Sequence, residues 1–142
     1  AIPCDKNKFI WGGVLGSVLP VTPPLATKSY MTLENLAKEP FVLLEEGALS
    51  EPMEAFKQAG LEPVIRLWVH DDYSILSMIE SELGVSILPE LVLRKTNYSV
   101  AILQIKPALT RKIGIIMKDK NSLPIASKYF IDFLFEHIDE LP

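Results

Sequence analysis

The polar residues best placed for chemistry gather at two points, each directly after an apolar run of strand length. His70-Asp71-Asp72 follows one run, and Glu45-Glu46-Gly47-Ala48 follows another. In a functional interpretation, His70 and the N–H groups that open the next helix hold a small ligand, such as a carboxylate. In the alternative interpretation, the aspartates only cap a helix and the glutamates belong to an ordinary loop. The residues leave both interpretations open.

The rest of the chain shows no motif for catalysis or metal binding. His70, His137 and Cys4 lie far apart, without the spacing of metal ligands. There is no G-x-S-x-G motif and no phosphate loop. The glycines at 12, 13 and 16 lack a preceding strand and a Lys-Ser/Thr pair, so we interpret them as a turn. We therefore expect no metal, no cofactor and no enzymatic activity.

Composition limits the classes of protein that remain. The 142 residues, 49% of them hydrophobic, suffice for one domain or two small lobes. With 14 basic and 18 acidic residues the net charge is −4, which argues against DNA binding by these residues alone. No run is long enough to cross a bilayer, the start does not resemble a signal peptide, and the single cysteine suggests a reducing compartment. We expect a cytoplasmic chain without membrane contact.

Apolar runs alternate with amphipathic segments through residue 95, which predicts an α/β fold with a mostly parallel, doubly wound sheet. Ligands of such sheets bind at the carboxyl ends of the strands. Trp68 is expected in the core or in an interface. Expected helices begin after Thr32, Ser50 and Asp71 or Asp72, the third ending at Gly84, and others begin at Pro89 and Pro124. Strands are expected at 17–21, 41–44, 63–69, 85–88, 100–105 and 113–117.

Five segments in order resemble the effector-binding domain of LysR-type transcriptional regulators. They are LPVTPPLA, TLENLAKEPFVLLEEG, PMEAFKQAGLEP, DDYSILSMIESELGVSILPELVL and RKIGIIMKDKNSLPIASKYFIDFL. Two positions depart from the family pattern: Pro23 stands where histidine is usual, and Glu82 where glycine usually precedes Leu-Gly. The Glu82 departure implies a different ending for the preceding helix. Residues 12–17 also look shorter and richer in glycine than their family equivalent.

The resemblance implies a periplasmic-binding-protein-like (type II) fold, of which the chain covers the second lobe and the returning part of the first. Residues 1–16 would connect to it, 17–96 would form the second lobe, and 97–142 the returning strands and C-terminal helix of the first lobe. The implied function is a non-catalytic, small-molecule effector-binding regulatory domain of a bacterial transcription regulator. Because solute-binding proteins share this fold, an extracytoplasmic solute-binding protein for transport is the alternative.

The resemblance and the strand-end rule agree on where an effector would bind. The expected partners are a small-molecule effector and a second copy of the chain, as a homodimer or higher homo-oligomer. DNA would be contacted only through a helix-turn-helix domain absent from these residues. The expected effector-binding residues are Glu46, Gly47, Ala48, Leu49, His70, Asp71, Asp72, Leu88 and Pro89.

Overall fold

The computed structural model describes residues 8–141, so Cys4 and the first part of the expected connecting segment lie outside the described residues. The fold divides into a larger unit, Val14–Thr110, and a smaller unit that contains residues 8–13 and 111–141. Strands β1 (Lys8–Pro20) and β5 (Val100–Ile115) contribute residues to both units. The lobe limits expected at 17–96 and 97–142 remain a prediction.

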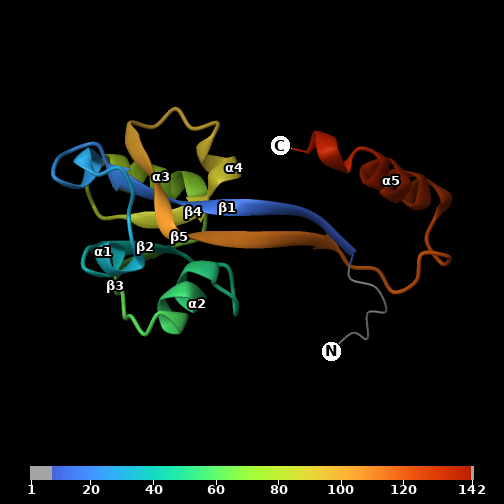
Figure 1. Cartoon of the computed structure of the whole chain (residues 1–142), viewed down its shortest axis with the longest axis horizontal. Helices are drawn as coiled ribbons and strands as arrows, with labels where there is room; N and C mark the ends of the chain where they lie inside the picture. The colour runs from blue at the N-terminus through green and yellow to red at the C-terminus, as the bar shows by residue number, and fades with distance from the viewer. Residues whose placement is uncertain (1–7, 142) are drawn as a thin grey trace. The chain divides into compact units, whose positions relative to one another are not determined.

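A three-stranded sheet of order β4-β1-β5 contains the longest strands of the chain (Figure 1). Strand β4 (Ser86–Pro89) runs antiparallel to β1, with Leu15 opposite Pro89 and Val18 opposite Ser86. The turn expected at glycines 12–16 is therefore wrong, because these residues lie inside β1. The strand expected at 100–105 and residues 113–115 of the strand expected at 113–117 belong to one continuous β5, which ends at Ile115. Hydrogen bonds within the sheet pair the backbone N–H and C=O groups of this glycine-rich stretch, which stabilises it as a strand.

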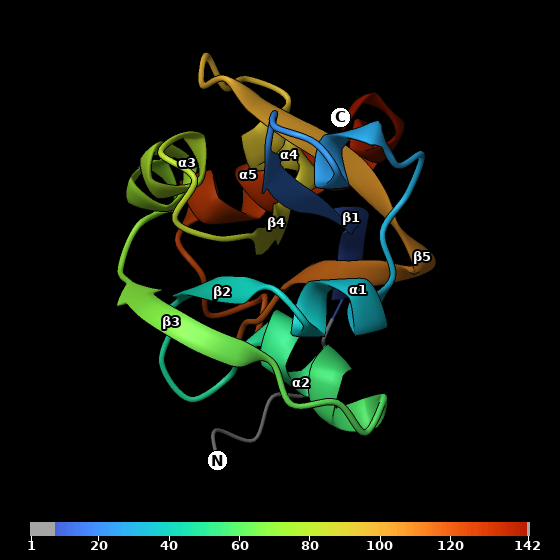
Figure 2. The same ribbon diagram turned by 90° about the vertical axis from the view of Figure 1, so that its left-hand side faces the viewer.

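A second, parallel pair joins β2 (Pro40–Leu44) to β3 (Val64–Val69), as Figure 2 shows. Phe41 also bridges to Val85 in parallel orientation. Val42 N–H donates to Val85 O at 2.9 Å, and Val85 N–H donates to Pro40 O at 2.8 Å. These bonds place the segment before β4 beside β2, so β2 lies between β3 and that segment.

Three helices of the larger unit begin at the caps expected from the sequence. Thr32 caps α1 (Leu33–Ala37) and exchanges hydrogen bonds with Asn35, and Ser50 caps α2 (Glu51–Gln58). Asp71 caps α3 (Asp72–Glu80). A short α4 (Glu90–Leu93) follows Pro89, and a 3-10 turn covers Leu25–Thr27. The side-chain oxygens of these capping residues accept hydrogen bonds from the N–H groups of the first helical turn, so the local sequence predicts where each helix begins.

The expectation that Gly84 ends the third helix is wrong. Helix α3 ends at Glu80, and Glu82 adopts the left-handed conformation with φ 62°. Gly84 has a different role, because a Cβ there would lie 2.3 Å from Pro40 O. The missing side chain lets the backbone approach β2 closely enough for the Val85 hydrogen bonds.

Side chains alternate along β2 and divide the core into two layers. Phe41 and Leu43 pack toward α1 and α2, where Phe41 meets Phe56 edge to face at 5.4 Å between ring centroids. Val42 joins the opposite cluster, which includes the inner residues of α3: Ile75, Leu76 and Ile79. In Figure 2 the helices α2 and α3 accordingly lie on opposite sides of the β2–β3 pair. Helices on both faces of parallel strands confirm the α/β class.

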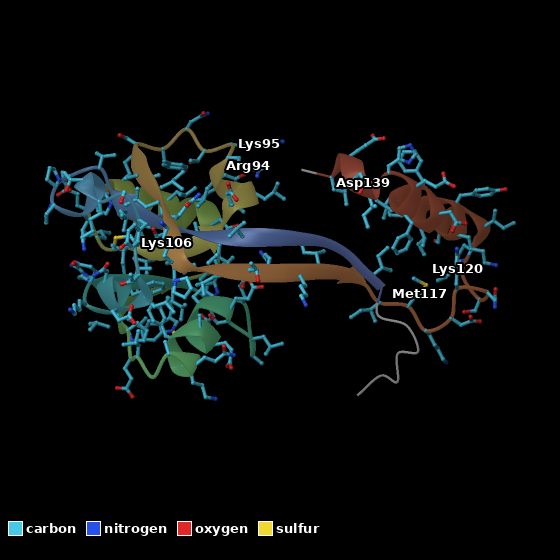
Figure 3. All side chains as sticks on the ribbon, in the orientation of Figure 1. Arg94, Lys95, Lys106, Met117, Lys120 and Asp139 are labelled. Carbon is cyan, nitrogen blue, oxygen red and sulfur yellow. The ribbon has the colours of Figure 1, made fainter. Side chains whose placement is uncertain are left out.

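The smaller unit is dominated by α5 (Ile125–Glu136), which is followed by a 3-10 turn over Ile138–Glu140. Figure 3 shows Lys120 before α5, where its ammonium pairs with Asp132. His137 stacks on Phe133 with ring centroids 4.0 Å apart. Four large apolar side chains of α5 are exposed: Ile125, Tyr129, Phe130 and Phe133. Within residues 8–141, no helix has the length and apolar character to cross a bilayer.

Candidate functional site

A groove of about 1390 Å³ runs along α2 in the larger unit. Its wall begins at the carboxyl end of β2, follows the loop 45–50 and helix α2, and continues to residues 60–63 before β3. Leu15 of β1, Trp68 of β3 and residues 108–110 of β5 complete the lining. The volume is enough to hold a drug-sized small molecule.

The loop after β2 owes its path to a glycine and to a cap. Gly47 has φ 86°, a conformation that favours glycine, and no atom lies within 4 Å of the position of an added Cβ. Ser50 Oγ then accepts the Met53 N–H at 3.4 Å and starts α2. Between them, Ala48 and Leu49 face solvent, and Leu49 is 86% exposed. The loop therefore presents backbone and apolar side-chain surface to the groove.

The two polar junctions expected from the sequence meet at the ends of neighbouring parallel strands. Glu45 N–H donates to Val69 O at 2.7 Å, which aligns the ends of β2 and β3. Beyond these ends, His70 Nδ1 lies 3.7 Å from Glu45 Oε2, and both side chains are exposed. Because the pair is exposed to water, it contributes little to stability.

Asp71 serves the helix that follows. Its Oδ1 accepts the Ser74 N–H at 2.9 Å, and its Oδ2 accepts the Ser74 hydroxyl at 2.5 Å. The hydroxyl bond, followed by the backbone bond, lowers the pKa of the Asp71 carboxyl from its ordinary value of 3.8. The start of α3 is thus occupied by an anionic side chain of the protein itself.

The nine expected site residues lie in different surroundings. Glu46, Gly47, Ala48 and Leu49 line the groove. His70 lies beside Glu45 at the groove's edge, whereas Asp71 and Asp72 begin α3 and are outside the lining. Leu88 is 1% exposed and belongs to the core. Pro89 lies outside the lining but is the register partner of Leu15, which is part of it.

Trp68 is the main groove residue that sequence reasoning placed elsewhere. It is 61% exposed, so it does not lie in the core, and the interface that the sequence left open for it remains a prediction. Its register partner on β2 is Leu43, which is also part of the lining. Val64, Arg66 and Trp68 are all exposed on β3, but the register shifts between Phe41 and Val42, so a two-residue alternation alone does not place Trp68. Residues 108–110 and Leu15 gave no signal, because strand pairing alone brings them to α2.

The groove combines backbone N–H groups near Gly47, several carboxylates and one indole, which suits binding of a small molecule. Among residues 8–141 no three His, Cys, Asp or Glu side chains lie close enough to hold a metal ion. The arrangement therefore offers reversible recognition through charge, hydrogen bonds and apolar contact.

Comparison with known sequences gives a consistent result. The family profile described as the LysR substrate binding domain matches residues 15–139. The transcriptional dual regulator GltC of Bacillus subtilis is 27% identical over 139 residues, which are 95% of this chain and 46% of GltC. The chain thus spans about half the length of this curated relative.

Solved structures show the same fold. The regulatory domain of CcmR from Synechocystis, in complex with 2-PG, has a TM-score of 0.85 at 20% identity and covers all of this chain, which spans 71% of that structure. The effector-binding domain of QuiR in complex with shikimate has a TM-score of 0.80 at 22% identity, with 95% and 66% of the two chains covered. These likenesses confirm the periplasmic-binding-protein-like fold expected from the sequence.

Proposed function

The chain belongs to the LysR substrate-binding-domain family, and we propose that it is the small-molecule effector-binding part of a LysR-type bacterial transcription regulator. The observation that carries the proposal is the groove along α2, which opens at the carboxyl ends of parallel strands, where this class of fold binds ligands. The ligands named with the domains of QuiR and CcmR add support from two neighbours of the same fold.

The proposed site is the groove wall formed by Glu46, Gly47, Ala48 and Leu49, with His70 at its edge. Of the other predicted residues, Asp71 caps α3 and Asp72 opens it, Leu88 lies in the core cluster that includes α3, and Pro89 is the register partner of Leu15 in the lining. Of this set, the loop residues and His70 are proposed to contact the effector directly. No catalytic step is proposed, and no cofactor is needed for reversible binding. The transport alternative is unsupported, because the matched profile and GltC are those of regulators.

The partners of the whole protein follow from the same proposal. DNA contact is assigned to a helix-turn-helix domain outside these residues, since the net charge of −4 disfavours phosphate binding here. Self-association, as a homodimer or higher homo-oligomer, is supported by the exposed apolar side chains of α5, because such patches recruit partners. A cytoplasmic location goes with the proposed role in transcription.

A thermal-shift screen of small metabolites tests the proposal. A ligand that binds only the folded state at about 100 times its Kd adds about 2.7 kcal/mol to stability, which raises Tm by roughly 5–10 °C in a chain of this size. Ala108→Trp should abolish the shift, because Ala108 is exposed and lines the groove.

The matched control is Ala126→Trp, which adds the same bulk at an exposed position of α5 outside the lining. It should keep the full shift. A hit whose shift survives Ala108→Trp, or is lost equally in both variants, would place binding elsewhere and contradict the proposed site.

A further inference from the structure

The charged side chains that line the groove are strongly unbalanced. They comprise one lysine, Lys57, against five glutamates: Glu45, Glu46, Glu51, Glu54 and Glu62. The cations Arg94 and Lys95 lie at the end of α4, which the β4–β1–β5 sheet separates from α2 (Figures 1 and 3). Lys106 is on β5 and outside the lining, where its ammonium lies 4.6 Å from the ring centroid of Tyr30. The summed formal charge of the side chains that line the groove is therefore negative.

The N-termini of the helices near the groove do not compensate for this negative charge by offering N–H groups to an anionic ligand. At α2, Ser50 already accepts the Met53 N–H, and Glu51 and Glu54 occupy the first turn. Pro52 in that turn has no N–H. At α3, Asp71 accepts from Ser74 through both oxygens. At both helix starts the protein's own oxygens thus accept N–H groups that a carboxylate ligand would otherwise use.

An exposed indole adds the second component of the groove. Trp68 is 61% exposed and lines the groove at the level of Leu43, two residues before the glutamate pair 45–46. An aromatic face attracts a cationic nitrogen, and it does so most strongly when that face is an indole. Carboxylates and an indole at the same end of a groove form a chemical environment suited to an ammonium group.

We infer that the effector carries a cationic nitrogen, held between Trp68 and the carboxylates of Glu45 and Glu46. This inference rests on the proposed function and specifies the class of its ligand. The effector class then differs in charge from a carboxylate such as shikimate. The His70 imidazole next to Glu45 stands where a ligand cation would compete for the same oxygen.

The test compares three probes by amide chemical-shift titration of the whole 142-residue chain. Choline is the cationic probe, dimethylbutanol is its uncharged isostere, and shikimate is the carboxylate. A ligand with so few atoms is expected to bind in the millimolar range. Choline should move the amides of Gly47–Leu49 and the Trp68 indole N–H saturably, with a Kd at least about fivefold lower than that of the isostere.

Two pairs of variants separate the groove from general surface charge. Trp68→Leu and the double change Glu45→Gln/Glu46→Gln should each weaken choline about fivefold or more. The matched controls are Tyr73→Leu, an exposed aromatic of α3, and Glu34→Gln/Glu39→Gln, which removes two charges beside α1. Neither control lies in the groove lining, and both should leave the Kd within about twofold.

The outcomes distinguish the inference from the proposed function. Shifts at Gly47–Leu49 with shikimate, but none with choline at on the order of 50 mM, would overturn the cationic class and leave the groove as the effector site. Equal binding of choline and its isostere would also overturn it. If the metabolite screen returns ligands that leave Gly47–Leu49 unmoved, the proposed site itself fails. If the control variants weaken choline binding as much as the groove variants do, the binding depends on net surface charge and the inference is wrong.

Discussion

Gly84 lies where the segment before β4 approaches the backbone of β2, and Gly84→Ala is expected to destabilise the fold severely. The added Cβ would lie 2.3 Å from Pro40 O, 3.1 Å from Pro40 C and 3.3 Å from Val42 Cγ2. Ordinary van der Waals contact begins at 3.4 Å, so the two backbones must separate by about 1 Å. The obstacle is backbone, which cannot rotate away as a side chain can.

The magnitude follows from what that separation breaks. The hydrogen bonds Val85 N–H to Pro40 O and Val42 N–H to Val85 O measure 2.8 and 2.9 Å, and Val42 and Val85 are buried. Each lost bond costs about 1 kcal/mol net, and forcing extra volume into a packed core costs about 1–3 kcal/mol. Together these terms predict a loss of about 3–5 kcal/mol in the free energy of unfolding, and a Tm lower by roughly 10–17 °C.

Urea unfolding followed by far-UV circular dichroism measures this loss. Gly16→Ala is the matched control, because its tightest contact would be the flexible end of Leu93, with Cδ1 at 3.0 Å, while the nearest backbone atom, Leu103 O, would lie at 4.0 Å. The control should lose less stability than Gly84→Ala. A Gly84→Ala protein within about 0.5 kcal/mol of the parent would refute the close-approach argument, since such small changes are typical of unconstrained surface sites.

Three further predictions concern a strained turn, a titrating cap and an exposed helix face. Glu82→Gly should raise the free energy of unfolding by about 0.5–1 kcal/mol, because φ 62° favours glycine; no gain in urea unfolding would count against strain there. Because the pKa of Asp71 is lowered in the folded state, its carboxylate stabilises the fold above pH 3.8, and this stability is lost as the pH falls through the folded pKa. Asp71→Asn should therefore flatten the acid limb of a Tm-versus-pH curve, and an unchanged acid limb would contradict this. Tyr129→Glu/Phe130→Glu should weaken self-association in sedimentation velocity without lowering Tm, since these side chains are 72% and 61% exposed; a parent chain that is monomeric at high concentration would refute the self-association proposal.

Elements defined by neighbouring residues were predictable from the sequence. The caps Thr32, Ser50 and Asp71 act within four residues of themselves, so their patterns identify α1, α2 and α3 directly. The buried run of β2 and the left-handed Gly60 after α2 are equally local signals. Strand-end reasoning and the family resemblance both pointed to residues 46–49, which line the groove, and their contact with an effector remains a prediction.

Features that depend on distant partners were not predictable. Glycines 12, 13 and 16 were interpreted as a turn, because no local pattern shows that they lie inside a long central strand of the β4-β1-β5 sheet. Gly84 read as a helix stop, since its real constraint is the Pro40 carbonyl more than forty residues earlier. For Trp68, which is 61% exposed, a core or interface position was predicted, because the sequence of one strand does not show which of its two faces is covered. The same limit kept residues 108–110 out of the predicted site.

The central claim is that the groove along α2 binds the effector, and an amide chemical-shift map with a hit from the metabolite screen tests it most directly. We expect saturable shifts at Gly47, Ala48 and Leu49, smaller shifts at His70 and Asp72, and unmoved amides throughout α5. Shifts confined to α5, with Gly47, Ala48 and Asp72 unmoved, would contradict it.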